Sequence, residues 1–242
     1  MRITILLCLL ITIYTYNPPK LTIYIESLCP DTGRFMSQSF NKLYESKIRN
    51  KLASSVEIIP FGNAHELEPI EGKRQFECQH NEKECYGNRL LLCAQQELAQ
   101  SQYESFFICY FKKLVEVGRV KINIDESMTE CFNGSTGQMG LLKLCEQTEG
   151  NELLHKAGLE TGEHDYIPYI IVDGKHTKEY QAEAEKDLHS FLCKFNNLEE
   201  ECSKTLNLRG LNYLNEEKVK KENNITFKEF KDSLRKRGLI SN

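Results

Sequence analysis

Cys29 is the residue whose type and neighbours point most directly to chemistry. It follows the apolar segment 21–25 and precedes Pro30, which suits the first position of a helix because its missing N–H is not needed there. This pattern predicts that Cys29 lies at a helix N-terminus, where free N–H groups and the helix dipole stabilise a thiolate and lower the thiol pKa. A thiolate is the nucleophile of thiol–disulfide exchange, so the pattern predicts a redox-active cysteine that is at least partly exposed.

A proline late in the chain supports this interpretation. Pro168 follows Ile167 and directly precedes the apolar segment 169–172, which is typical of a buried strand. The bond before a proline is the kind of peptide bond that adopts the cis form at low cost. We therefore expect the Ile167–Pro168 bond to be cis and Pro168 to lie beside Cys29.

The number of cysteines indicates that at least one thiol has no partner within the chain. The sequence has ten, but Cys8 lies in the apolar run 3–13, which is too short to span a bilayer and is typical of a signal peptide. We expect residues 1–17 to be removed, which leaves nine cysteines in an oxidising compartment. An odd number leaves at least one thiol free or paired outside the chain. We expect this thiol to be Cys29, because the other eight can pair among themselves. The others are expected to form four disulfides, in pairings that the sequence leaves open: Cys78, Cys85, Cys93, Cys109, Cys131, Cys145, Cys193 and Cys202.

The elements that position Cys29 are expected to begin with strand, helix and strand. Segment 21–25 predicts a buried strand, apolar residues recur at helical spacing from Met36 to Leu52, and segment 56–61 predicts a second strand. A helix crossing between them predicts that the two strands pair in parallel.

The second half of the chain is expected to be mainly helical. Residues 62–90 are polar and are expected to form a long loop. Further predicted elements are helices around 91–98 and 106–115, several short helices over 137–158, a hairpin turning at Asp173-Gly174, a closing helix over 184–195, and a charged tail over 203–242 with a short helix from Thr226.

Residues 78–93 read CQHNEKECYGNRLLLC. This segment resembles the C-Q-H-G-x-x-E-C-x-x-N-x-x-x-x-C signature of the gamma-interferon-inducible lysosomal thiol reductase family. Asn81 stands where the family has glycine, and asparagine is the cheapest substitute if that position has a positive φ. The segment 26–30, ESLCP, is similar to the family's approach to its active site, and the resemblance covers residues 20–202. The matching signature positions are Cys78, Gln79, His80, Glu84, Cys85, Asn88 and Cys93.

The resemblance implies a thioredoxin-like α/β fold over residues 18–202, with a helical, disulfide-rich insertion. It also implies a thiol oxidoreductase that acts on disulfide-containing protein substrates and uses no cofactor or metal. The active-site positions that correspond to the family's are Cys29, Thr32 and Pro168.

One departure from the family changes the expected mechanism. The family's reductases carry C-x-x-C, whereas this chain reads Cys29-Pro30-Asp31-Thr32. A threonine hydroxyl cannot form a disulfide, so we expect a monothiol mechanism in which Cys29 forms a mixed disulfide and a small external thiol releases it. Thr32 is expected to donate a hydrogen bond to the thiolate, while the charge of Asp31 raises the thiol pKa.

Three alternatives remain open at this point. The first is a secreted binding protein that traps partners through Cys29 without turnover. The second is a zinc site on Cys78, His80, Cys85 and Cys93, although the cysteine spacing and an oxidising compartment disfavour zinc. Gln79 and His80 either take part in catalysis or, as we favour, keep the disulfide-rich loop in shape.

Charge and modification motifs bear on the compartment. The formal net charge of −4 indicates neither nucleic acid nor a membrane surface as partner, and no membrane span is expected after residue 17. Asn133 and Asn224 begin N-glycosylation motifs. We therefore expect passage through the secretory pathway to the lysosome or the cell exterior.

Overall fold

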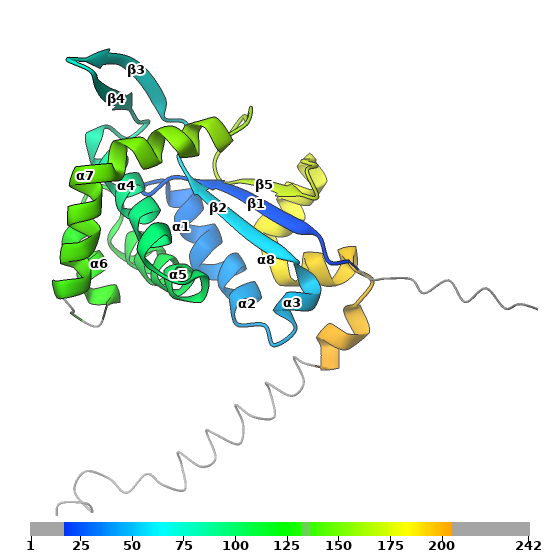
Figure 1. Ribbon diagram of the computed structural model, residues 1–242. Coiled ribbons are helices and arrows are strands. Elements are labelled where there is room, and N and C mark those ends of the chain that lie inside the picture. The colour runs from blue at the N-terminus through cyan, green and yellow to red at the C-terminus, as the bar shows by residue number, and fades with distance from the viewer. Residues whose placement is uncertain (1–16, 133, 135, 205–242) are drawn as a thin grey trace, which may run out of the picture. The chain divides into compact units, whose positions relative to one another are not determined.

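The computed structural model describes residues 17–132, 134 and 136–204 (Figure 1). The expected signal peptide, most of the charged tail, Asn133 and Asn224 lie outside the described residues. The chain divides into one compact unit up to Asn196 and a second from Asn197, of which residues 199–204 are described as helical. Every structural feature discussed below belongs to the first unit unless stated otherwise.

A three-stranded mixed sheet lies at the centre of this unit. Strand β1 (Lys20–Ile25) runs between β2 (Ser55–Pro60) and β5 (Tyr169–Val172). It pairs in parallel with β2, as predicted, and antiparallel with β5, with Ile23 opposite both Ile58 and Ile170. The central strand is mostly apolar, and Leu21, Ile23, Tyr24 and Ile25 are all buried.

A helical segment crosses between β1 and β2, as the sequence predicts, but it is not a uniform α-helix. It consists of α1 (Pro30–Arg34), a π-helical stretch η1 (Phe35–Phe40) and α2 (Asn41–Tyr44), followed after a turn by α3 (Arg49–Leu52). The periodic apolar side chains of this segment, such as Met36, are buried. Helical turns of the π type widen a helix locally and are often found at functional sites.

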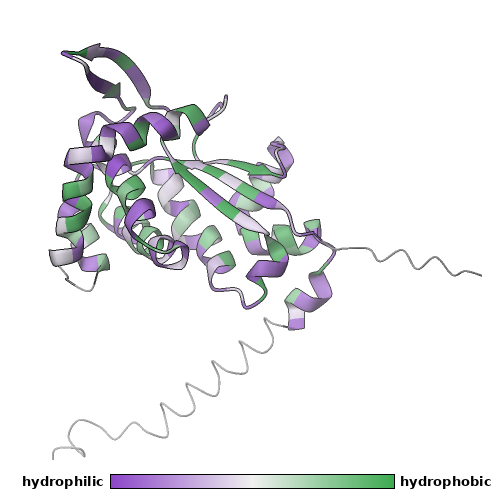
Figure 2. Cartoon of the chain, in the orientation of Figure 1, coloured by the Kyte–Doolittle hydropathy of each residue, from purple (hydrophilic) through white to green (hydrophobic). Residues whose placement is uncertain are grey.

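The polar stretch after β2 contains a hairpin, so the prediction of a long loop is wrong. Strand β3 (His65–Ile70) pairs with β4 (Lys73–Glu77) around a turn at Glu71 and Gly72, both of which have positive φ. All positions of β3 are exposed, so the sequence has no alternation of buried apolar and exposed polar residues that would predict this strand. The hairpin projects from the body of the unit (Figure 1) and is largely hydrophilic (Figure 2).

Four helices follow the hairpin: α4 (Glu82–Glu97), α5 (Gln100–Val117), α6 (Ile124–Cys131) and α7 (Thr136–Glu160). The last is one long helix where several short ones were predicted. Its glycines lower the helix propensity that the sequence shows, but packing on α4 outweighs this: a Cβ at Gly150 would lie 3.0 Å from the Arg89 side chain.

The end of the unit consists of β5 and α8 (Lys178–Phe195). The predicted turn at Asp173-Gly174 forms, with positive φ at both residues. A single β-bridge between Val172 and Lys175 closes it, and no second strand follows within the described residues. The molecule is therefore a mixed α/β protein. Within the described part of the chain, no helix is both long and apolar enough to cross a membrane.

Candidate functional site

Cys29 is the N-cap residue of α1, in the turn that follows β1. It is a free thiol, and its Sγ donates a hydrogen bond to the carbonyl oxygen of Ile167 at 3.6 Å. The peptide bond between Ile167 and Pro168 is cis, as predicted. The two segments meet because β1 and β5 are neighbouring strands. The structure thus brings Cys29 and the residue before Pro168 into contact.

The surroundings of Cys29 correct two predictions. The residue is 7% exposed, so it is buried rather than partly exposed. Burial also raises the pKa of the Cys29 thiol above its ordinary value, and the charges of Glu26 and Glu84 raise this pKa further. Hydrogen bonds from the N–H and hydroxyl of Thr32 lower the thiol pKa, as expected, but they do not outweigh burial.

Asp31 is not among the groups with the largest effects on the pKa of the Cys29 thiol. Its carboxylate forms an ion pair with Arg34 on the same helix, and both side chains are 59% exposed. The opposing negative charges come instead from Glu26 and Glu84, which the sequence analysis did not select as neighbours of the thiol.

Glu26 follows β1 directly and is completely buried. Its Oε1 accepts hydrogen bonds from the backbone N–H of Asn63 at 2.7 Å and from Asn63 Nδ2 at 2.9 Å. Its Oε2 has no hydrogen-bond partner among the described residues. Burial, with a further contribution from the charge of Glu84, raises the pKa of Glu26 to about 7.

His80 and Glu84 complete a group that we call the acid cluster, defined as Glu26, His80 and Glu84. His80 Nδ1 lies 2.6 Å from Glu84 Oε2, and the His80 backbone N–H donates to Glu84 Oε1 at 3.0 Å. The same ring nitrogen lies 3.9 Å from Glu26 Oε2. The cluster therefore places two buried carboxyl groups and one imidazole beside a free thiol.

The signature segment builds this cluster through one face of α4. Glu84 and Asn88 are four residues apart and point to the same side of the helix. Ser27 binds both, because its backbone N–H donates to Asn88 Oδ1 at 2.8 Å and its hydroxyl donates to the Glu84 carbonyl at 3.0 Å. A Cβ at Gly87 would lie 2.4 Å from Ser27 Oγ, so a glycine lets the helix approach the turn that carries Cys29.

A disulfide and a strained residue shape the loop that carries His80. Cys78 and Cys85 are bonded to each other on either side of it. Asn81 has a φ of 65°, the positive value that would explain a glycine at this position. Gln79 accepts a hydrogen bond from Asn63 Nδ2 at 2.8 Å, and Asn63 in turn holds Glu26. Gln79 thus acts on the acid cluster indirectly.

The other cysteines of the predicted disulfide set are also bonded. Cys93 pairs with Cys145 and Cys109 with Cys131, which links α4 to α7 and α5 to α6. Cys193 of the first unit and Cys202 of the second unit are each disulfide-bonded. These bonds leave no thiolates for zinc at Cys78, Cys85 and Cys93.

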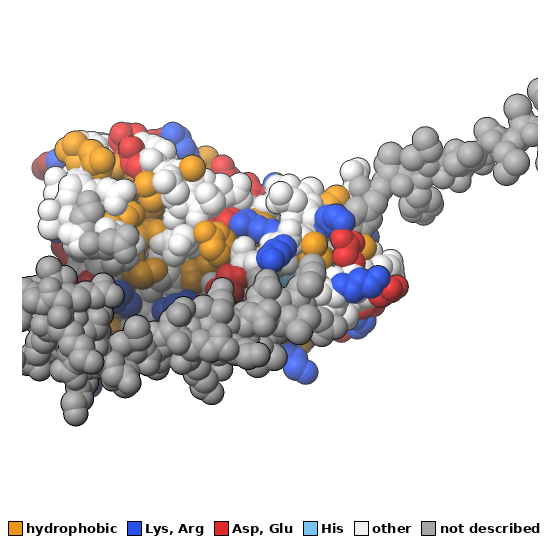
Figure 3. Space-filling model, turned by 90° about the horizontal axis from the view of Figure 1, so that it is seen from below, with side chains coloured by type: hydrophobic (Ala, Val, Ile, Leu, Met, Phe, Trp, Pro, Cys, Tyr) orange, Lys and Arg blue, Asp and Glu red, His pale blue; other side chains and the backbone are white. Residues whose placement is uncertain are grey.

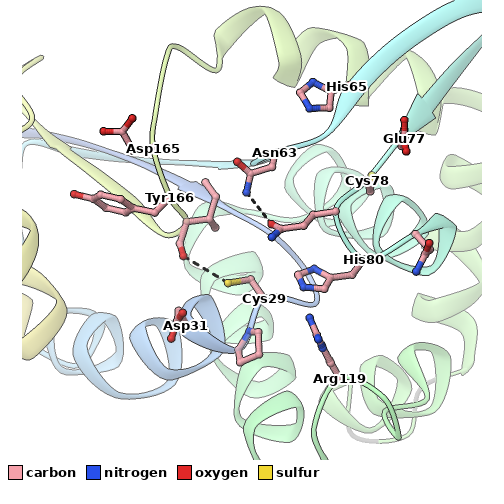
Figure 4. A pocket seen from close by; sticks show the side chains of 14 residues that line it. Cys29, Asp31, Asn63, His65, Glu77, Cys78, His80, Arg119, Asp165 and Tyr166 are labelled. Carbon is pink, nitrogen blue, oxygen red and sulfur yellow. Dashed lines mark hydrogen bonds between the residues drawn. The ribbon is translucent and has the colours of Figure 1, made fainter.

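Cys29 lines a pocket of about 730 Å³ (Figure 4). Figure 4 shows the His80 ring extending from α4's side of the pocket toward Cys29, with Arg119 on the same side. A second pocket of about 570 Å³ shares Asp31, Tyr166 and Ile167 with the first. The remaining residues that line the first pocket are Pro30, Asn63, His65, Glu77, Cys78, Gln79, Asn81 and Asp165.

Comparison with known proteins connects this site to a family. The family model for gamma interferon inducible lysosomal thiol reductase (GILT) matches residues 20–135, which contain Cys29 and the whole signature segment. This chain is similar to the GILT family over that segment. A gamma-interferon-inducible lysosomal thiol reductase of Carassius auratus is 28% identical over 184 residues, covering 74% of this chain and 69% of the relative.

Two further relatives show the same relationship. GILT-like protein 1 of Drosophila melanogaster is 25% identical over 201 residues, covering 78% of this chain and 79% of its own. The gamma-interferon-inducible lysosomal thiol reductase of Mus musculus is 26% identical, covering 67% of this chain and 63% of its own.

The acid cluster brings three potential metal ligands together. One ligand atom from each of its three residues lies within 4.8 Å of the others. However, His80 Nδ1 and Glu84 Oε2 are 2.6 Å apart, whereas two ligands bound to one zinc ion at about 2.0–2.2 Å stand more than ~3 Å apart. Because these two atoms share a hydrogen bond, the cluster is better suited to sharing protons than to holding an ion.

Sequence reasoning missed Glu26, Asn63 and the role of Glu84. Glu26 was visible as a charged residue directly after a buried strand, an unusual place for an unpaired carboxylate. Asn63 carried no signal, because it lies in a polar stretch and acquires its role only when β2 is placed beside β1. On the face of the molecule drawn in Figure 3, acidic and basic side chains are interspersed where the described residues are visible.

Proposed function

We propose that this protein belongs to the GILT family and is a thiol–disulfide oxidoreductase with a thioredoxin-like fold that works through one thiol, Cys29. The observation that carries the proposal is a free cysteine that lines a pocket and contacts the carbonyl before Pro168. The parallel β1–β2 pair joined by a helical crossover, with β5 antiparallel beside β1, supports the fold.

The reaction balances with a small thiol as reductant. The Cys29 thiolate attacks one sulfur of a protein disulfide, a bond forms between the two sulfurs, and the second substrate sulfur leaves and takes up a proton. A small thiol then attacks the mixed disulfide and releases the substrate's first sulfur, which leaves Cys29 bound to the small thiol. A second small thiol frees Cys29 and forms a small-molecule disulfide, so two thiols are oxidised as one protein disulfide is reduced.

Thr32 occupies the position of the second family cysteine and is completely buried. Its hydroxyl and N–H hydrogen-bond to the Cys29 sulfur and lower the thiol pKa. Thr32 therefore stabilises the thiolate but offers no sulfur that can expel a bound substrate.

The compartment proposed is the lysosome or the cell exterior, reached by the secretory pathway. The relatives from Carassius auratus and Mus musculus are named as lysosomal thiol reductases. Several disulfides in the described unit fit an oxidising secretory route. Disulfide-containing proteins are the proposed substrates, and cysteine or glutathione is the proposed external reductant.

The test is a reduction assay on a disulfide-bonded protein with excess small thiol, combined with mass spectrometry of trapped adducts. Cys29→Ser should abolish both reduction and adduct formation. Thr32→Cys should shorten the lifetime of the mixed disulfide and raise turnover, because it supplies a resolving sulfur, whereas the matched control Thr32→Ser should not. Unchanged reduction by Cys29→Ser would overturn the proposal.

A second function is favoured by the burial and raised pKa of Cys29, which both oppose fast turnover. In this case the protein captures secreted partners through a long-lived mixed disulfide. Adducts that form on the wild type but persist in excess small thiol would favour capture over turnover.

A further inference from the structure

The acid cluster contains a group that the proposed function does not yet use. Glu26 is completely buried, and its Oε1 is held by two hydrogen bonds from Asn63. Its Oε2 has no hydrogen-bond partner among the described residues. A buried carboxylate oxygen without a partner is costly, and the cost disappears when the group is protonated. The partnerless Oε2 is therefore the atom of Glu26 that readily takes up a proton.

Groups from three parts of the fold contact Glu26 or the turn that carries it. Cys29 lies in the same turn, and its backbone N–H donates to the Glu26 carbonyl at 3.4 Å. His80 and Glu84, from the start of α4, approach Oε2 and form a hydrogen-bonded pair with each other. From α5, Tyr110 donates to the Ser27 carbonyl, and burial raises the pKa of its hydroxyl so that it stays neutral.

His80 connects this buried carboxyl to the pocket. Its side chain is 14% exposed, whereas the Glu26 and Glu84 side chains are 1% exposed. His80 and Cys29 line the same pocket, and the His80 ring extends toward Cys29 in Figure 4. A proton can therefore pass between the cluster and a molecule in the pocket without opening the core.

We propose that Glu26 exchanges a proton with Cys29 and, through the imidazole of His80, delivers it to the departing sulfur of the substrate. The inference rests on the proposed function, because it gives the acid cluster a role in that reaction. As Cys29 attacks, its proton passes to the Glu26 carboxylate, and the S–S bond of the substrate breaks. The leaving thiolate takes up the proton, which restores the carboxylate and leaves a mixed disulfide and a neutral thiol.

Two consequences follow from charge. The Glu26 carboxylate raises the pKa of Cys29, so the thiol and the carboxyl titrate as a coupled pair. Burial raises the pKa of Glu26 to about 7, so thiolate formation should show a step near that pH. Proton delivery should matter only when the leaving thiol is basic, since an acidic aromatic thiol leaves readily as the thiolate.

The experiment uses the full chain with Glu26→Gln, Glu26→Asp, and Glu66→Gln as a matched control. The glutamine variant keeps an oxygen for Asn63, the aspartate variant keeps a carboxyl, and Glu66 is a glutamate bonded to a histidine outside the cluster. The first measurement is the rate of Cys29 alkylation by iodoacetamide against pH. The second is mixed-disulfide formation with an alkyl disulfide, oxidised glutathione, and an aromatic one, dithiobis(nitrobenzoate).

We expect Glu26→Gln to lose the step near pH 7 and to alkylate faster than wild type at pH 8. It should react with the alkyl disulfide about 100-fold more slowly, within the range for loss of a proton donor, and with the aromatic one at a similar rate. Glu26→Asp should keep a step at a shifted pH, and Glu66→Gln should match the wild type.

A step that persists in Glu26→Gln, or an equal loss of rate with both disulfides, would overturn the inference. If Glu26→Gln does not fold, the other two proteins decide. The inference is overturned if the alkylation profile of the wild type has no step near pH 7, or if the profiles of Glu26→Asp and the wild type are identical. A wild type that forms no mixed disulfide but shows the two-step alkylation profile would overturn the proposed function and support proton exchange between Cys29 and Glu26.

Discussion

Two glutamate–histidine groups in this molecule have opposite acid–base behaviour. In the acid cluster, burial raises the pKa of Glu26 to about 7. On the projecting hairpin, Glu66 is bonded to His155 of α7 at 2.6 Å and to Arg74 at 2.6 Å, and these bonds lower the pKa of Glu66. The residue types are nearly the same, but only the hairpin group includes an arginine. The Glu26 and Glu84 side chains are 1% exposed, whereas that of Glu66 is 30% exposed.

The difference shows what decides the behaviour of a buried carboxyl. Glu66 has a permanent cation beside it, so its charged form is favoured. Glu26 has a second carboxyl, Glu84, and an imidazole that is already bonded to that carboxyl. The fold therefore favours proton uptake by a carboxyl group beside Cys29 and an ion pair on the hairpin.

The largest effect is expected from crowding Glu26. Gly62 has a φ of 58°, and a Cβ there would lie 2.3 Å from Glu26 Cγ. Gly72, at the hairpin turn, has a φ of 75° and no described atom within 4 Å of its Cβ position. Gly62→Ala should lower the free energy of unfolding by roughly 2–5 kcal/mol, whereas Gly72→Ala should lower it by about 1 kcal/mol from backbone strain alone.

Urea unfolding of both variants measures the two losses. Equal losses would show that the turn after β2 can move away from Glu26, and the acid cluster would then be no more tightly packed than the hairpin.

The second effect is a pH dependence of stability with opposite signs at the two sites. The folded-state pKa of Glu26 lies above its ordinary value of 4.5, so the folded protein binds more protons between pH 4.5 and about 7. The stability from this group is fully present below pH 4.5 and is lost as the pH rises to about 7, by on the order of 3 kcal/mol. Glu26→Gln should flatten the stability profile over this window.

Glu66 has a lowered pKa, so its contribution is present above pH 4.5 and is lost in acid. Glu66→Gln should therefore leave the decline between pH 4.5 and 7 in place. Urea unfolding at several pH values measures both profiles, and a decline that survives in Glu26→Gln would assign it to another group.

The third effect concerns two residues with positive φ, one beside each site. Asn81 has φ 65° and ψ −172°, a combination that glycine adopts far more easily, and Glu71 has φ 51° at the hairpin turn. Asn81→Gly should raise the free energy of unfolding by about 1 kcal/mol, since relief of strain exceeds the added entropy of the unfolded chain. Glu71→Gly should change it by less than about 0.5 kcal/mol.

Thermal unfolding of Asn81→Gly, Glu71→Gly and the wild type measures both changes in stability. A loss of stability in Asn81→Gly would mean that the asparagine side chain contributes interactions that outweigh its backbone strain.

The sequence predicted the elements with a buried face and missed those without one. Leu21, Ile23 and Ile25 are buried, so β1 and its parallel partner could be predicted from apolar residues alone. The hairpin has no buried face on β3, so its strands left no periodic signal. Cys29 was identified by its type and by the proline after it, which is local information.

The pKa of Cys29 could not be predicted from local information. The sequence indicates a helix N-terminus, which lowers the thiol pKa, but it does not show how deeply the thiol is buried. Glu84 lies far along the chain from Cys29 and reaches it only because Ser27 binds α4. The sign of the pKa shift therefore depends on tertiary packing.

The smallest effect is expected at the hairpin network. Arg74 bonds to Glu66 within the hairpin and to Glu152 of α7, so it ties the two together. Such exposed pairs add little to global stability, but they oppose local opening. Arg74→Gln should speed hydrogen–deuterium exchange in β3 and β4, after correction for the intrinsic rate, while the midpoint of thermal unfolding stays unchanged. Hydrogen–deuterium exchange should also speed up in the wild type as the pH falls below about 4.5 and Glu66 becomes protonated. The bonds to His155 and Arg74 lower the pKa of Glu66, so protonation of this carboxyl weakens those bonds. A hairpin whose exchange responds to neither change would be held by its backbone pairing alone, and the contrast with the acid cluster would then lie in burial and not in the arginine.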